Sequence, residues 1–259
     1  MYTCGIDIGS VSTEVVILNL ENSKIKSYVI IPTGSNSRDS ADKALKDSLR
    51  KACLTKNDLK AIVATGYGRI NIPFADKNIT EISCHAKGVA SLFPDLEIKT
   101  VIDIGGQDSK VIKLENGNPI DFLMNDKCAA GTGRFLEVMA KALEISLDEF
   151  ASIFNKTNEK VDITSTCTVF AESEIVSLIG HGIDKNKIIK GLIYSIANRI
   201  ISMVERVGLE ERVCITGGVA KNLGVVKALE EKLGVKIIIP FEPEIIGALG
   251  AAYLAQDLY

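Results

Sequence analysis

The stretch TVIDIGGQDS, residues Thr100–Ser109, repeats the pattern with which the chain opens, YTCGIDIGSVST at Tyr2–Thr13. In each copy an apolar run of strand length ends in Asp-Ile-Gly, and a second apolar run follows the turn. An internal repeat of strand, Asp-Ile-Gly and strand implies two similar halves with a ligand bound between them. The sequence therefore predicts an α/β protein built from two related domains.

The first of these turns has the composition of a phosphate-binding loop. After Asp7 it holds a glycine and three small hydroxyl residues, Gly9, Ser10, Ser12 and Thr13. The backbone N–H groups of such a turn can surround a phosphate, and a carboxylate beside it can hold hydrated Mg²⁺. We expect Asp7 to hold that cation.

The composition is that of a globular protein without a membrane-spanning segment. The 259 residues are 46% hydrophobic, enough to bury one large core or two moderate ones. The longest apolar runs are of strand length, far short of a bilayer span. The amino terminus lacks the features of a signal peptide, which predicts a cytoplasmic protein. Because the 30 basic and 33 acidic residues are interspersed, neither nucleic acid nor a membrane is expected as a partner.

Two cysteines stand out by their positions. Cys128, in the stretch NDKCAAGTGRFLE at Asn125–Glu137, precedes a glycine-spaced turn and a helical pattern. Cys167, in the stretch TSTCT at Thr164–Thr168, comes before an apolar helical run that begins at Val169. We expect both thiols at helix N-termini, where unpaired N–H groups and the helix dipole lower the pKa of a thiol.

The remaining cysteines fit packing better than chemistry. Three of them lie in strand-like runs or at the end of a helical pattern: Cys4, Cys214 and Cys53. Cys84 lies next to His85 in a helical segment, and this pair could be a ligand site. No further Cys or His lies at metal-ligand spacing, so packing is favoured. The roles of Cys84, His85 and the second histidine, His181, stay open.

Several helix starts and one further loop can be placed. Ser40 or Asp42 is expected to begin the first helix, Ser146–Glu149 forms a capping box, and Asp184 caps a long helix. Later in the chain a short strand ends at a glycine pair, Gly217 and Gly218, and a Gly- and Ala-rich helix starts at Pro243-Glu244. The glycine pair permits the backbone to approach a flat ring closely.

These motifs together resemble a known fold. Four segments are similar, in order and spacing, to the nucleotide-binding segments of the acetate kinase, sugar kinase, Hsp70 and actin fold. They are DIGS at Asp7–Ser10, DIGG at Asp103–Gly106, TGG at Thr216–Gly218 and the C-terminal helix. The resemblance implies duplicated ribonuclease H-type domains with a nucleotide cleft between them. It divides the chain into a first lobe, residues 1–98 plus 242–259, and a second lobe, residues 99–241.

Within that fold, three stretches resemble one family. GGQDSK, NDKCAAGTGRFLE and CTVFAESE look like the activator component of 2-hydroxyacyl-CoA dehydratases, of the benzoyl-CoA reductase ATPase type. The resemblance implies a homodimer that shares one 4Fe-4S cluster, with Cys128 and Cys167 of each subunit as ligands. The need of such a cluster for four thiolates agrees with two subunits that supply two each.

The resemblance also assigns roles at the nucleotide site. Asp7 and Asp103 would hold Mg²⁺ through water, and Gln107 would orient the attacking water. As a neutral amide Gln107 cannot take up a proton, which predicts slow hydrolysis of ATP that depends on the partner. The remaining residues would bind the nucleotide: Gly9, Ser10, Ser12, Thr13, Gly105, Gly106 and Gln107 at the phosphates, and Gly217, Gly218 and Lys221 at the adenosine.

The implied function is ATP-dependent transfer of one electron from ferredoxin or flavodoxin to an iron–sulfur dehydratase. Other interpretations stay open: an activator of a benzoyl-CoA-type or double-cluster reductase, a small-molecule kinase of the same fold, or an actin-like scaffold. A kinase would need a carboxylate base, for which Asp108 is available. A zinc ion on the dimer axis would need the same four cysteines.

Overall fold

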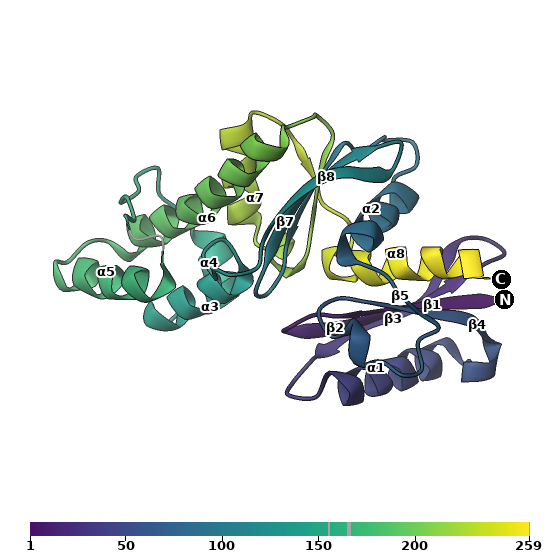
Figure 1. Ribbon diagram of the computed structural model, residues 1–259. Coiled ribbons are helices and arrows are strands. Elements are labelled where there is room, and N and C mark those ends of the chain that lie inside the picture. Colours follow the sequence, from purple (N-terminus) through teal and green to yellow (C-terminus); the bar gives the residue numbers. More distant parts are fainter. Residues whose placement is uncertain (155, 165–166, 259) are drawn as a thin grey trace.

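The computed structural model of the protein describes residues 1–154, 156–164 and 167–258. Ser165 and Thr166, in the segment before Cys167, therefore lie outside the described residues. Two five-stranded sheets dominate the two halves of the molecule, and the chain termini lie close together at one end (Figure 1). The predicted duplication of an α/β unit is confirmed.

The first sheet comprises β1 (Tyr2–Ile8), β2 (Ser12–Asn19), β3 (Lys24–Pro32), β4 (Leu59–Thr65) and β5 (Lys77–Asn78). Its strand order is β3-β2-β1-β4-β5, in which β1 and β2 form an antiparallel hairpin and β4 runs parallel to β1. The inward residues of β1 and β2 share a hydrophobic core with helix α1 (Ser37–Ala52), which covers one face of the sheet.

Helix α1 begins earlier than the sequence indicated. Its N-cap is Asn36, whose side-chain oxygen accepts hydrogen bonds from the backbone N–H groups of Arg38 and Asp39. The predicted start at Ser40 or Asp42 was wrong because asparagine caps a helix as well as serine or aspartate does.

The second sheet comprises β6 (Thr100–Ile104), β7 (Ser109–Glu115), β8 (Asn118–Asn125), β9 (Val213–Thr216) and β10 (Ile237–Ile238). Read from β8, its order is β8-β7-β6-β9-β10, with an antiparallel hairpin of β6 and β7 and with β9 parallel to β6. The two sheets thus have the same topology. The lobe boundaries at 98/99 and 241/242 stay a prediction, although the strands of each sheet fall within them.

Two helices, α2 (Glu81–Leu92) and α8 (Ile246–Leu254), lie between the sheets (Figure 1). One hydrophobic core joins residues of both sheets with residues of both helices. The helices pack closely because a Cβ atom on Gly250 would lie 1.7 Å from the carbonyl oxygen of Cys84, so that only glycine fits there. The two helices therefore form one close-packed pair at the junction of the halves.

The second half also carries five helices, α3 (Gly133–Ala142), α4 (Leu147–Ile153), α5 (Thr168–Gly180), α6 (Lys185–Val207) and α7 (Leu223–Leu233). The Ser146 capping box of α4 and the Asp184 cap of α6 are confirmed. Helices α3, α4 and α5 form the end of the molecule far from the termini (Figure 1). Single turns of 3₁₀ helix lie at Lys56–Asp58, Arg69–Asn71, Gly218–Lys221, Pro243–Ile245 and Ala255–Leu258.

Three cysteines are core residues, as expected. Cys4, Cys84 and Cys214 are completely buried, and burial raises the pKa of the Cys84 thiol to about 12. Cys53 is exposed at the end of α1. Within the described residues no helix has both the length and the apolar character needed to cross a bilayer.

Candidate functional site

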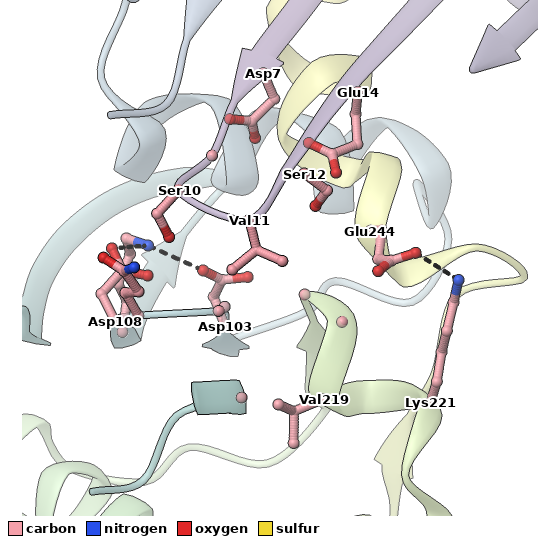
Figure 2. A pocket seen from close by; sticks show the side chains of 18 of the residues that line it. Asp7, Ser10, Val11, Ser12, Glu14, Asp103, Asp108, Val219, Lys221 and Glu244 are labelled. Carbon is pink, nitrogen blue, oxygen red and sulfur yellow. Dashed lines mark hydrogen bonds and ion pairs between the residues drawn. The ribbon is translucent and has the colours of Figure 1, made fainter. Parts of the chain in front are cut away.

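A cavity of about 620 Å³ lies between the two Asp-Ile-Gly hairpins (Figure 2). It is bordered by the loop after β1, the loop after β6 and the segment after β9. The structure brings together all of the predicted nucleotide-site residues but one, and these line the cavity: Asp7, Gly9, Ser10, Ser12, Asp103, Gly105, Gly106, Gln107, Gly217, Gly218 and Lys221.

Thr13 has a different environment from its neighbours. Its hydroxyl is completely buried, 2.8 Å from the hydroxyl of Thr33, which in turn donates to the carbonyl oxygen of Gly9. Successive side chains of a strand point to opposite faces, so Thr13 points away from the cavity that Ser12 and Glu14 line. Through Thr33, Thr13 supports the loop after β1 from the side away from the cavity.

The first hairpin presents two buried carboxylates to the cavity. Asp7 and Glu14 are register partners across β1 and β2, and Figure 2 shows both side chains beside the same space. Burial and then the charge of Glu81 raise the pKa of Asp7 well above its ordinary value. Burial and then the charge of Asp7 raise the pKa of Glu14 in the same way. Both shifts disfavour the ionised form of these two acids, and a cation bound beside them would favour it.

In the second hairpin a lysine stands where the first has Glu14. Lys110 is the register partner of Asp103 across β6 and β7. Its ammonium lies 2.7 Å from Glu81, 2.9 Å from Asp108 and 3.1 Å from Asp103, and its side chain is 2% exposed. Burial alone would lower the pKa of Lys110, but the charges of Asp103, Glu81 and Asp108 outweigh it and raise that pKa.

Asp103 is held by three groups. Lys110 contacts Oδ2, the Thr216 hydroxyl donates to Oδ1 at 2.8 Å, and His85 Nδ1 lies 3.6 Å from Oδ1. Burial alone would raise the pKa of Asp103, but the charges of His85 and Lys110 and the Thr216 hydrogen bond lower it to about 2. Because the Thr216 hydroxyl donates to Asp103, His85 Nδ1, 3.1 Å from that hydroxyl, must donate to it. His85 Nε2 then faces Asp7 at 4.0 Å.

The segment after β9 borders the cavity opposite the first hairpin. Gly217 and Gly218 lead into a 3₁₀ turn that ends at Lys221. The Lys221 ammonium lies 2.8 Å from Glu242 and 2.5 Å from Glu244, and the latter contact is drawn in Figure 2. Two apolar residues of α4 complete this part of the wall, Leu147 and Ala151.

The loop after β1 and the loop after β6 touch each other. A Cβ atom on Gly106 of the second loop would lie 2.3 Å from Cγ2 of Val11, at the tip of the first. A larger residue at this position would have to displace the Val11 side chain. The second loop also contacts α3, because the backbone N–H groups of Gly133 and Arg134 donate to the carbonyl oxygens of Gly105 and Gly106 at 2.9 and 2.8 Å.

The two singled-out cysteines lie outside the cavity and outside the hydrophobic core. Cys167 is the N-cap residue of α5, as predicted, and it is exposed. Cys128 is partly exposed, but the prediction that it starts a helix was wrong. Helix α3 begins at Gly133 with Thr132 as its N-cap, and the Asn125 side chain donates to the Cys128 carbonyl oxygen in the preceding loop.

Several charged residues of the cavity were not identified from the sequence as site residues: Glu14, Glu81, His85, Lys110 and Glu244. For two of them a signal was present. Glu14 and Lys110 each follow the aspartate of their Asp-Ile-Gly motif by seven residues, so the repeat itself places them at equivalent positions. For Glu81, His85 and Glu244 the local sequence gives no such signal.

Comparison with known proteins agrees with this geometry. The activator of lactoyl-CoA dehydratase from Anaerotignum propionicum is 48% identical over 258 residues, 99% of this chain and 98% of the relative. The crystal structure of Acidaminococcus fermentans (R)-2-hydroxyglutaryl-CoA dehydratase component A has a TM-score of 0.95 at 45% identity, covering 100% of this chain and 98% of the other.

A second solved structure holds a nucleotide analogue. It is the activator of the 2-hydroxyisocaproyl-CoA dehydratase from Clostridium difficile with bound ADPNP, with a TM-score of 0.93, 46% identity and coverage of 100% and 95%. A ROK family glucokinase from Streptomyces griseus has a TM-score of 0.61 at 13% identity, which confirms the predicted fold alone. Residues 4–255 match the BadF/BadG/BcrA/BcrD ATPase family, and the chain belongs to that family.

Proposed function

We propose that this ATPase activates a 2-hydroxyacyl-CoA dehydratase by delivering one electron to it in a step driven by ATP hydrolysis. Sequence identity of 46–48% over nearly the whole chain to activators of three such dehydratases supports the proposal. The observation that carries it is the pair of accessible thiols, Cys128 and Cys167, in the half that contains the second phosphate loop. Ferredoxin or flavodoxin would be the electron donor.

The two thiols fit half of an iron–sulfur site. The described residues contain no group of three or more potential metal ligands among His, Cys, Asp and Glu. A 4Fe-4S cluster takes four thiolates, so one chain supplies two and a second copy supplies the others. Helices α3 and α5 pack against each other, which brings the segments that carry Cys128 and Cys167 to one end of the molecule. When bound, such a cluster stores and releases a single electron.

A homodimer is also supported by the surface of α5. Four large apolar side chains of this helix are exposed, Val169, Phe170, Val176 and Ile179, by 44–68%. Exposed apolar side chains gathered on one element are typical of interaction surfaces. Because the helix starts at Cys167, a two-fold axis near Cys167 would bring the thiols of both subunits together and cover this surface.

Nucleotide would bind in the cavity between the halves. We propose that Asp7 and Asp103 hold Mg²⁺ through water and that the loops after β1 and β6 surround the phosphates. Gly217, Gly218 and Lys221 would lie at the adenosine. Gln107 is exposed in the second loop, where its amide can orient a water molecule but cannot take up its proton, so hydrolysis is expected to be slow.

The contact of the second phosphate loop with α3 supports a mechanical link from the nucleotide to Cys128. A coupling of about 3 kcal/mol shifts a one-electron potential by only about 130 mV. We therefore propose that nucleotide binding also changes the geometry of the thiol-bearing segments. The hydrogen bonds from Gly133 and Arg134 to this loop would carry its movement directly to the start of α3.

The acyl-CoA specificity would reside in the partner enzyme. No residue of this chain is proposed to contact the acyl-CoA. A benzoyl-CoA-type or double-cluster reductase is the alternative partner. The kinase alternative gains no support from Asp108, because its carboxylate is engaged by Lys110.

The test is nucleotide-dependent activation under strict exclusion of oxygen. The reduced protein is mixed with a 2-hydroxyacyl-CoA dehydratase, and the dehydrated acyl-CoA is measured with MgATP, MgADP or no nucleotide. We expect the dehydrated acyl-CoA to form with MgATP but not with MgADP or without nucleotide. The Cys128→Ala protein should give no product. The Cys53→Ser protein should activate normally, because Cys53 is exposed at a different place on the surface. Activation without ATP, or by the Cys128→Ala protein, would contradict the proposal.

A further inference from the structure

Lys110 is a buried ammonium whose donors all have partners within the protein. Glu81, Asp108 and Asp103 lie 2.7, 2.9 and 3.1 Å from Nζ. A lysine ammonium has three protons to donate, so none remains for a nucleotide phosphate while these contacts hold. Lys110 lines the cavity but directs its charge to the carboxylates around it.

Two of these carboxylates belong to the two ends of the second phosphate loop. Asp103 lies at the end of β6, and Asp108 closes the loop, where its carbonyl oxygen accepts a hydrogen bond from Gly105 N–H at 3.0 Å. Gln107 lies between them. Lys110 thus holds both ends of the loop that carries the Gln107 amide, and removal of its charge would release them.

The third carboxylate belongs to α2. Glu81 is the first residue of this helix, and His85 follows at the spacing that places it on the same face. His85 contacts Thr216 and Asp103 at the ends of β9 and β6. Because α2 packs closely against α8, the ion pair of Glu81 with Lys110 joins the second phosphate loop to the helix pair between the halves.

We infer that Glu81 and Lys110 are positioning residues for ATP hydrolysis, whose ion pair fixes the second phosphate loop, and Gln107 with it, relative to α2. The inference rests on the proposed nucleotide site and adds a pair of residues that need not contact nucleotide. The loop and α2 then move as one unit when the halves close on the nucleotide.

The experiment compares Glu81→Gln with the unchanged protein. Glutamine keeps the size of the side chain and one acceptor oxygen but removes the charge. We expect kcat for ATP hydrolysis to fall about 10-fold, as for other residues that orient a functional group through a neighbour. KM for ATP and Kd for MgADPNP should stay within about 2-fold, because no nucleotide contact is lost.

The matched control is Glu210→Gln, which removes the 2.8 Å ion pair of Glu210 with Lys113. Lys113 lies on the same strand as Lys110, but neither Lys113 nor Glu210 lines the cavity. It should leave kcat unchanged. Should Glu81→Gln fail to fold, Glu81→Asp takes its place: it keeps the charge, shortens the reach by one methylene, and should lower kcat with unchanged KM.

A second readout separates positioning from mere support of the fold. Hydrogen exchange of the α2 amides is measured with MgADP and with MgADPNP. We expect a difference between the nucleotides in the unchanged protein and in Glu210→Gln, reduced at least about 3-fold in Glu81→Gln because the loop no longer moves the helix. An unchanged kcat, a parallel loss of kcat and nucleotide affinity, or a persistent exchange difference would overturn the inference. Failure of the unchanged protein to hydrolyse ATP would instead overturn the proposed function.

Discussion

The two Asp-Ile-Gly hairpins have the same strand pairing but opposite charge at one position. In the first, Asp7 faces Glu14; in the second, Asp103 faces Lys110. Among the described residues, His85 is the only basic side chain within ion-pair distance of either carboxylate of the first hairpin, at 4.0 Å from Asp7. The two acids of the first hairpin have raised pKa values, whereas the aspartate of the second hairpin is ion-paired with the lysine opposite it.

This difference suits the two hairpins to different roles at the same cavity. Buried carboxylates without a counter-charge are costly and favour a bound cation, which fits a role of the first hairpin towards the Mg²⁺ of the nucleotide. In the second hairpin Asp103 shares the Lys110 ammonium with Glu81 and Asp108. That hairpin is suited to hold a loop in place and to pass its position to α2 and α3.

The largest effect is expected from removing the cation of the second hairpin. Lys110→Met leaves Glu81, Asp103 and Asp108 close together without their shared ammonium. The free energy of unfolding should fall by about 3–5 kcal/mol, as is typical when one partner of a buried ion pair is removed. Urea denaturation measures it. Lys113→Met on the same strand is the control and should change little, since Lys113 pairs at the surface.

The free energy of unfolding should also depend on pH, with a smaller effect that has opposite signs for the acids of the two hairpins. The pKa of Asp103 is lowered to about 2 from an ordinary 3.8, so its stabilising contribution is full above pH 3.8 and is lost as the pH falls towards 2. That shift corresponds to about 2 kcal/mol. Asp103→Asn should remove this acid-dependent loss from urea-denaturation curves recorded across that range.

Glu14 should behave in the reverse way. Its pKa is raised in the folded protein, so the associated stability is full below the ordinary pKa of 4.5 and is lost as the pH rises through the raised value. In the metal-free protein, with EDTA present, Glu14→Gln should flatten that decline. If Glu14→Gln and Asp103→Asn changed the pH profile in the same direction, the contrast between the hairpins would be wrong.

Much of the fold could be predicted because the repeat is visible in the sequence. The strands Tyr2–Ile8 and Thr100–Ile104 are the apolar runs expected before the two Asp-Ile-Gly turns, and Val213–Thr216 is the short strand expected before the glycine pair. The residues proposed for the nucleotide site lie at or just after these turns. Loop geometry was harder: Cys128 was expected at a helix start, whereas α3 begins only after Gly131 and Thr132 have turned the chain.

The charged lining of the cavity depends on contacts that the local sequence does not display. Glu81 meets Lys110 only because α2 packs between the sheets, and His85 reaches Thr216 from a position 131 residues earlier in the chain. Thr13 shows the converse. Its small hydroxyl side chain fits a phosphate loop, but the alternation of side chains along β2 turns it away from the cavity.

The most direct test of the central claim is the iron and sulfide content of the anaerobically purified dimer. The account predicts four iron and four sulfide per dimer. It also predicts that both are lost in Cys128→Ala and in Cys167→Ala and retained in Cys53→Ser. A protein that contained zinc instead, or that kept its iron and sulfide without these two thiols, would contradict the account.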